Sequence, residues 1–379
     1  MTNQTEVGQA LAIALAAQVP VLLWGAPGTG KTSVIRAMAR AAELPCETVI
    51  SSIREPSDFA GLPVVTRPAD GAAGHADGAR VDFAPPRWAT RLAGADRGVL
   101  FFDEVSTAPP AVQAALLRVV LERTVGDLTL PEGVAVVAAA NPPEQAADGW
   151  DLSAPLANRF CHLGWPVDAR TVADGFAGGW PAPVPPELPT EWDRQVGVVR
   201  SWVAGFLTVR PELVLAVPEQ STLAGRAWPS PRSWDMASRL LAAGATVADG
   251  GNPSTPGSAG SLLVRGCVGD GAGVEFLTWL VEADLPDPEA VLADPETFQL
   301  PERGDRAYAA LSSVAAAVAA NPSGDRWERG WRAFAHAAGS VPDVAAAAAR
   351  ALARSRPMGA ELPEQIDVFV PLLRDAGLL

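Results

Sequence analysis

Short apolar runs and helical segments alternate along the first part of the chain. Each of three runs is almost wholly apolar and short enough for a strand buried on both faces, as in a parallel sheet. They cover residues 20–24, 98–102 and 134–140. Between the first two, residues 33–42 place Val34, Ala37, Met38 and Ala41 on one face of a helix. The alternation predicts an α/β fold with a parallel sheet between helices.

The pattern changes after this α/β part. Residues 166–190 are rich in proline and are typical of a connector, and residues 249–260 (DGGNPSTPGSAG) are typical of a linker. Helical periodicity covers residues 194–207, and the Ala-rich stretches 309–320 and 344–353 favour helices. We therefore expect an α/β core over residues 1–168, a linker and helical lid over 169–248, and a mainly helical C-terminal region over 249–379.

Four aromatic residues lie at helical spacing in the C-terminal region, namely Trp279, Trp327, Trp331 and Phe334. We interpret them as core residues, with a binding stripe as the alternative. We expect His336 to be structural, because no second His or Cys lies at a metal-ligand spacing.

Composition narrows the class of protein. Hydrophobic residues make up 48% of the 379 residues and charged residues 19%, so the chain can bury a sizeable core. A formal net charge of −14 repels phosphate backbones, so we expect no nucleic-acid partner. The three cysteines lie far apart, which favours a reducing, cytoplasmic location. No apolar run reaches about 20 residues, so no membrane span is expected.

Lys31 is the only lysine among the 29 basic residues. Lysine and arginine are not interchangeable, so this position is singled out. The spacing Gly25-x4-Gly30-Lys31-Thr32 is that of a phosphate-binding loop between a strand and a helix. The alternative is a chance match in a chain with 35 glycines. The predicted phosphate-binding residues are Gly25, Ala26, Pro27, Gly28, Thr29, Gly30, Lys31, Thr32 and Ser33.

The residue types in this loop fit that chemistry. Gly25, Gly28 and Gly30 let backbone N–H groups approach an anion with no Cβ in the way. The N-terminus of the following helix adds its partial positive charge. The Lys31 ammonium can reach between the β- and γ-phosphates of a nucleotide, and the Thr32 hydroxyl can bind Mg²⁺.

Polar side chains follow the next two apolar runs. Asp103 and Glu104 come after residues 98–102, and Asn141 comes after residues 134–140. Ligands of parallel sheets bind at the carboxyl ends of the strands. We expect Asp103 to complete the Mg²⁺ shell, Glu104 to take a proton from the attacking water, and Asn141 to hydrogen-bond that water or the γ-phosphate. A solvated acidic turn and an Asn-Pro turn are the alternatives.

Together these segments resemble the AAA+ ATPases. The matching segments are GAPGTGKTS (25–33, Walker A), GVLFFDE (98–104, Walker B) and AAANP (138–142, sensor 1). The segments IREPSDFAGL (53–62) and DEVSTAPPAVQAALL (103–117) look like the MoxR branch, although position 106 is Ser where that branch usually has Asn. The match continues into residues 122–131, which predict a hairpin with Gly126-Asp127 at its turn.

The resemblance implies roles for two arginines. Arg159, in LANRF, looks like the arginine finger that reaches the nucleotide of a neighbouring subunit. Arg232, in PSPRSW, resembles the sensor 2 residue at the start of a lid helix, with Arg226 and Arg239 as alternatives. The segment 61–85 resembles the helix-2 insertion of the clade that includes the MoxR branch, an insertion that contacts substrates. Here it would be a hairpin around a Gly/Ala-rich tip at residues 71–78. A plain surface loop is the equal alternative.

The resemblance also implies a function. A MoxR-like AAA+ ATPase would bind ATP and Mg²⁺ between subunits of a homo-oligomeric ring, a hexamer. It would remodel or activate a client or adaptor protein, such as a von Willebrand factor A-domain protein. One alternative is a nucleotide-gated protein-binding switch whose hydrolysis is incidental. Another is a nucleic-acid-associated NTPase, which the negative charge disfavours.

Overall fold

The chain forms two compact units in the computed structural model, which describes residues 3–66, 80–142, 145, 150–190, 192–247 and 253–378. The first unit consists of Met1–Glu187, Val217–Trp228 and Arg265–Gly269. The second consists of Leu188–Ala216, Pro229–Val264 and Asp270–Leu379.

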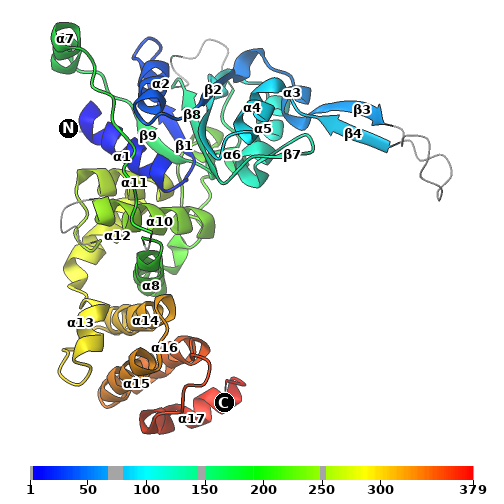
Figure 1. Cartoon of the computed structure of the whole chain (residues 1–379). Coiled ribbons are helices and arrows are strands. Elements are labelled where there is room, and N and C mark those ends of the chain that lie inside the picture. The colour runs from blue at the N-terminus through cyan, green and yellow to red at the C-terminus, as the bar shows by residue number, and fades with distance from the viewer. Residues whose placement is uncertain are drawn as a thin grey trace, which may run out of the picture. The chain divides into compact units, whose positions relative to one another are not determined.

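A five-stranded parallel sheet forms the centre of the first unit (Figure 1). In spatial order its strands are β2 (Cys46–Ile50), β5 (Arg97–Asp103), β8 (Gly133–Ala140), β1 (Val21–Trp24) and β9 (Cys161–Gly164). Strands β1, β5 and β8 are buried along nearly their whole length, and consecutive side chains point to opposite faces. Both faces of the sheet are therefore covered, which confirms the predicted α/β fold with a parallel sheet between helices.

The helices of this unit are α1 (Gln4–Ala16), α2 (Lys31–Ala41), α3 (Ser57–Ala60), α4 (Arg87–Ala93), α5 (Pro110–Glu122), α6 (Ala154–Ala157), α7 (Ala169–Gly178) and α9 (Ser221–Ala224). Helices α1, α2, α4 and α5 pack against the sheet, whereas α7 has only Gly175 buried. Short 3₁₀ turns η1 (Ser51–Ile53) and η2 (Val105–Thr107) follow β2 and β5. On α2 the buried apolar residues are Ile35, Met38 and Ala39. Val34, Ala37, Met38 and Ala41 share one face of this helix as expected, but only Met38 among them is buried, because the helix turns a neighbouring side to the sheet.

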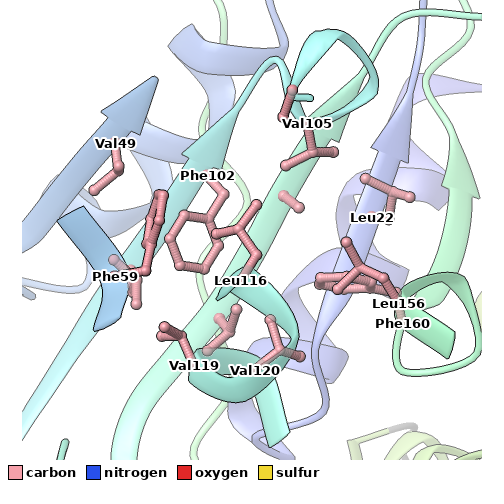
Figure 2. Close-up of a cluster of buried hydrophobic side chains, with 14 of the residues drawn as sticks. Leu22, Val49, Phe59, Phe102, Val105, Leu116, Val119, Val120, Leu156 and Phe160 are labelled. Carbon is pink, nitrogen blue, oxygen red and sulfur yellow. The ribbon is translucent and has the colours of Figure 1, made fainter. Parts of the chain in front are cut away.

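One large hydrophobic cluster fills the space between β5, β8 and the helices α3, α4 and α5 (Figure 2). Phe59 of α3, Trp88 of α4 and Phe102 of β5 pack with ring centroids 6.0 to 6.5 Å apart. Leu116 and Val119 of α5 are fully buried in the same cluster. Each such side chain contributes about 1.5–3 kcal/mol by leaving water. This packing holds α5 and β5 in place, and β5 ends at the predicted Asp103.

Two antiparallel hairpins leave this unit. β6 (Thr124–Val125) pairs with β7 (Leu128–Thr129), which confirms the hairpin predicted over residues 122–131. Gly126 in its turn has φ +61°, and a Cβ there would lie 2.4 Å from the Phe83 carbonyl oxygen, so only glycine fits. β3 (Leu62–Thr66) pairs with β4 (Arg80–Ala84), as expected for a hairpin in the segment 61–85. Its tip at residues 71–78 lies outside the described residues, and contact with substrates stays a prediction.

The second unit is helical. Its helices are α8 (Arg194–Val209), α10 (Pro231–Val247), α12 (Asp270–Ala283), α13 (Pro288–Ala293), α14 (Gly304–Ala320), α15 (Gly324–Ala338), α16 (Pro342–Arg354) and α17 (Val370–Asp375), with 3₁₀ turns η4 (Pro211–Leu213) and η5 (Glu364–Phe369). Helix α11 (Ser258–Val268) continues from this unit into residues 265–269 of the first. The mainly helical C-terminal region is confirmed.

The four aromatic residues predicted to be core residues are all buried in this unit. Trp327 and Trp331 pack edge to face at 5.8 Å, and the Trp327 indole donates to the Leu352 carbonyl oxygen. His336 lies against the Phe298 ring. Within the described ranges, no helix is long and apolar enough to cross a bilayer, and no group of three or more His, Cys, Asp and Glu side chains forms a metal site.

Candidate nucleotide-binding site

The predicted phosphate-binding loop connects β1 to α2. β1 ends at Trp24 and α2 begins at Lys31, so residues 25–30 form the loop. Gly28 and Gly30 have φ values of +79° and +89°, in the left-handed region that glycine enters without strain. A Cβ at either glycine would have no atom within 4 Å, so the backbone conformation, not crowding, requires glycine. The open space beside the helix N-terminus suits an anion.

Lys31 is buried, with 8% of its surface exposed. Its Nζ donates to the carbonyl oxygens of Gly25 (2.6 Å) and Ala26 (3.0 Å) and to Oδ1 of Asn141 (2.9 Å). Burial lowers the pKa of Lys31, and the nearby Asp103 carboxylate opposes this shift. An ammonium has three N–H donors, so a phosphate oxygen that binds Lys31 must replace one of these acceptors. Two residues that sequence reasoning selected separately, Lys31 and Asn141, are thus in direct contact.

Thr32 and Asp103 form a second contact between predicted site residues. Thr32 Oγ1, in the first turn of α2, donates to Asp103 Oδ2 at 2.7 Å. Hydroxyl and carboxylate oxygens are hard donors of the kind that Mg²⁺ prefers. Mg²⁺ in nucleotide sites keeps waters and phosphate oxygens and needs only one or two protein ligands. The pair Thr32 and Asp103 therefore fits a Mg²⁺–nucleotide complex.

Glu104 has a strained backbone. Its φ and ψ are 58° and 39°, in the left-handed region that residues other than glycine rarely adopt. Its N–H donates to Asp103 Oδ1 at 3.0 Å, and its side chain is exposed. Strain of this kind is retained mainly where function requires a particular orientation.

Ser52 is a site residue that sequence reasoning missed. It lies in η1, directly after β2, and its Oγ donates to Glu104 Oε2 at 2.5 Å. This hydrogen bond restrains the Glu104 side chain through one of its two carboxylate oxygens. The rule that selected Asp103 and Asn141, polar residues after parallel strands, would also have selected Ser52. The signal was weak because β2 is only partly buried and lacks a clear apolar run.

Trp165 is a second residue that was missed. Its indole Nε1 donates to the Thr29 carbonyl oxygen at 3.0 Å, and its backbone N–H donates to the Trp24 carbonyl oxygen at 2.6 Å. A Cβ at Gly25 would come within 3.2 Å of Trp165, so the loop passes close to this side chain. Trp165 therefore supports the loop at both ends. No local motif marks it, because it follows β9, far from the loop in sequence.

His162 supports the end of β1 from the neighbouring strand β9. Its Nδ1 accepts from the Trp24 indole at 2.9 Å, and its Nε2 lies 2.9 Å from the Ala157 carbonyl oxygen, where only an N–H is compatible. This pair of contacts assigns the neutral tautomer. Burial lowers the pKa of His162 to about 4, with the charge of Arg226 adding to the shift. The Arg226 guanidinium stacks 3.6 Å above the centroid of the Trp24 ring.

The two arginines implied by resemblance are placed differently. Arg159 follows α6 in the first unit, is half-buried, and donates to the Pro155 carbonyl oxygen. Arg232 is exposed at the second residue of α10, in the second unit. Their roles toward a nucleotide stay predictions. Arg226, an alternative to Arg232, contacts Trp24 beside the phosphate-binding loop.

Residues 20–160 match the family model described as AAA domain (dynein-related subfamily). The match spans the phosphate-binding loop, Asp103, Glu104, Asn141 and Arg159. This part of the chain is therefore similar in sequence to AAA domains. The parallel sheet, its flanking helices and the helical region that follows make up the AAA+ fold. Assignment to the MoxR branch stays a prediction.

Two solved structures are similar to the chain over a wider span. A putative ATPase from Cytophaga hutchinsonii is 19% identical, with a TM-score of 0.40, over 73% of this chain and 83% of that one. A full-length MCM homolog from Methanopyrus kandleri is 20% identical, with a TM-score of 0.41, over 71% of this chain and 57% of that one. No curated protein matches the sequence.

Proposed function

We propose that this protein is a MoxR-like AAA+ ATPase that converts ATP and water to ADP and phosphate and uses the reaction to remodel or activate a partner protein. One observation carries the proposal. Three segments distant in sequence meet here: Lys31 hydrogen-bonds Asn141, and Thr32 hydrogen-bonds Asp103, with Glu104 adjacent. A chance phosphate-loop match would not place the other predicted residues around it.

Each side chain has a distinct task in this proposal. Lys31 binds phosphate oxygens as a point charge, and Asn141 donates its amide N–H to the γ-phosphate or to the attacking water. Glu104 accepts the proton of that water, after its carboxylate leaves Ser52. Thr32 and Asp103 hold Mg²⁺, whose chemistry when bound is to neutralise charge on the phosphates.

The proposal extends to neighbouring subunits. We infer that copies of the chain form a ring, a hexamer, in which Arg159 reaches the nucleotide of the next subunit. Arg232 would contact the γ-phosphate in its own subunit. An arginine supplied in trans can contribute about 10³–10⁵ in rate. ATPase activity per subunit is therefore expected to fall steeply on dilution, and an equal activity in the dilute monomer would contradict the trans role of Arg159.

Hydrolysis is tested by phosphate release from Mg-ATP. The Glu104→Gln variant keeps the shape of the side chain but cannot take a proton, so its rate should fall on the order of 100-fold or more while ATP affinity is retained. Glu43→Gln, at an exposed glutamate after α2, is the matched control and should behave like the unmodified protein. If Glu104→Gln hydrolyses ATP at the unmodified rate, the proposed role of Glu104 is wrong.

The hydrogen bond from Ser52 to Glu104 favours a second candidate function. A carboxylate restrained by a hydrogen bond to Ser52 suits a nucleotide-gated switch, in which ATP controls partner affinity and turnover is incidental. Glu104→Gln separates the two. A remodelling ATPase with this change should trap its client or adaptor in ATP and lose function, whereas a switch should still function. The expected partner class, von Willebrand factor A-domain proteins, is tested by whether such a protein is retained by Glu104→Gln in ATP and released in ADP.

A further inference from the structure

Asn141 depends on a residue outside the motifs assigned above. Asn141 follows the last residue of β8, where its backbone N–H no longer pairs with a neighbouring strand. That N–H donates instead to Oγ of Ser106 at 3.1 Å. A backbone N–H removed from water needs an acceptor, and here a side chain supplies it. Ser106 thus sets the direction in which the chain leaves β8.

Ser106 is itself held firmly. It lies in η2, is 3% exposed, and its carbonyl oxygen accepts the N–H of Trp150 at 2.9 Å. The turn that contains Ser106 is closed by Glu104, whose carbonyl oxygen accepts both the N–H and the hydroxyl of Thr107. One short turn therefore places both Glu104 and the acceptor for Asn141. A serine buried in such a turn can hold the backbone of Asn141, and with it the Asn141 side chain, in one position.

The contact continues to the phosphate-binding loop, because Oδ1 of Asn141 accepts Nζ of Lys31. Ser106 and Lys31 therefore hold Asn141 from its backbone and its side chain, respectively. We propose that Ser106 is a positioning residue that holds the Asn141 amide where it distinguishes a γ-phosphate from its absence. This inference rests on the proposed function. It assigns Ser106 no contact with nucleotide.

Ser106→Ala tests the inference because it should change kcat and the preference for ATP over ADP while leaving ADP affinity nearly unchanged. Removal of a buried acceptor should lower kcat roughly ten-fold and reduce the preference for ATP over ADP by a similar factor. ADP affinity should change less than about two-fold, because the phosphate-binding loop itself is intact. Ser106→Thr, which restores the hydroxyl, should recover most of the rate. Ser313→Ala, which removes another fully buried serine hydroxyl in α14, controls for loss of stability.

A double-mutant cycle with Asn141→Ala sharpens the test. Since Ser106 acts through Asn141, the double variant should be no slower than Asn141→Ala alone. Additive losses would overturn the inference, as would equal losses of ATP and ADP affinity. If Ser106→Ala does not fold, Ser106→Cys preserves the volume with a weaker acceptor and should show the same split. If the unmodified protein lacks ATPase activity, the proposed function fails, but the ATP-over-ADP preference of these variants still decides the role of Ser106.

Discussion

The two units bury polar groups in different ways. At the strand ends of the first unit, Lys31 and Ser106 are buried, and each makes hydrogen bonds to groups from distant parts of the chain. In the second unit a large cluster of apolar side chains surrounds Trp327 and Trp331, and the indole N–H of Trp331 is buried without a hydrogen-bond partner, as is that of Trp88 in the first unit. The first arrangement concentrates polar chemistry at one edge of a sheet, whereas the second is an apolar core.

The difference shows how a site can be distinguished from a core. A buried ammonium is costly unless it is hydrogen-bonded, so a lysine held by three acceptors is retained for its chemistry. The strained backbone of Glu104 beside it points the same way. Trp331, whose buried indole N–H has no hydrogen-bond partner, stabilises through the area and shape of its ring. We therefore expect substitutions in the two units to affect different measurements.

The largest effect on stability is expected from the helical core. Trp331→Ala removes a fully buried ring that packs on Trp327, Phe334 and Phe369, and should lower the free energy of unfolding by about 3–5 kcal/mol. Trp331→Phe keeps a ring and removes the unpartnered N–H, so it should cost less than about 1.5 kcal/mol. Urea unfolding followed by far-UV circular dichroism measures both. If Trp331→Phe lost as much stability as Trp331→Ala, a phenyl ring could not replace the indole in this core.

The largest effect on activity is expected at the only lysine. Lys31→Arg keeps the charge, but a planar guanidinium does not fit among the carbonyl oxygens of Gly25 and Ala26. ATP turnover should fall on the order of 100-fold, with little change in the midpoint of thermal unfolding. Arg118→Lys, at an exposed ion pair on α5, is the matched reverse exchange and should be neutral. Near-normal turnover of Lys31→Arg would undo the assignment of this loop.

Acid should destabilise the first unit through His162. Its folded pKa of about 4 lies below the 6.5 of an unperturbed histidine, so the unfolded chain binds the proton first as pH falls. This contribution to stability is complete above pH 6.5 and is lost as pH falls toward 4. Between pH 7 and 5 the loss should be about 2 kcal/mol. His162→Gln, which can keep both hydrogen bonds, should remove that part of the pH dependence, and an unchanged pH dependence would exclude His162 as its source.

The smallest effect is expected at Ser52. Ser52→Ala removes the hydrogen bond that holds the Glu104 carboxylate, so basal ATP hydrolysis should rise roughly two- to five-fold. Ser57→Ala, at the start of the nearby helix α3, is the control. Steady-state phosphate release at saturating ATP measures the change. A lower rate in Ser52→Ala would mean that Ser52 helps to orient Glu104 for catalysis instead of restraining it.

Local patterns predicted much of the fold and of the candidate site. The parallel strands and the buried aromatic residues of the helical region could be predicted, because each depends on a short stretch of residues. The same holds for the polar residues at the carboxyl ends of the strands. The buried side of α2 could not be predicted in the same way. The period of a helix shows which residues share a face, but which face meets the sheet depends on how the helix packs.

The sequence alone determined the chemistry that this protein carries: a glycine-rich loop with a single lysine, and carboxylate and amide groups after apolar runs. Only the tertiary structure decided which of these groups meet. In the structure Lys31 hydrogen-bonds Asn141, and Ser52 hydrogen-bonds Glu104. The Trp165 indole hydrogen-bonds the phosphate-binding loop. The physical reason is that hydrogen bonds between strand ends depend on the order of strands in the sheet, and that order is set by packing between segments far apart in the chain.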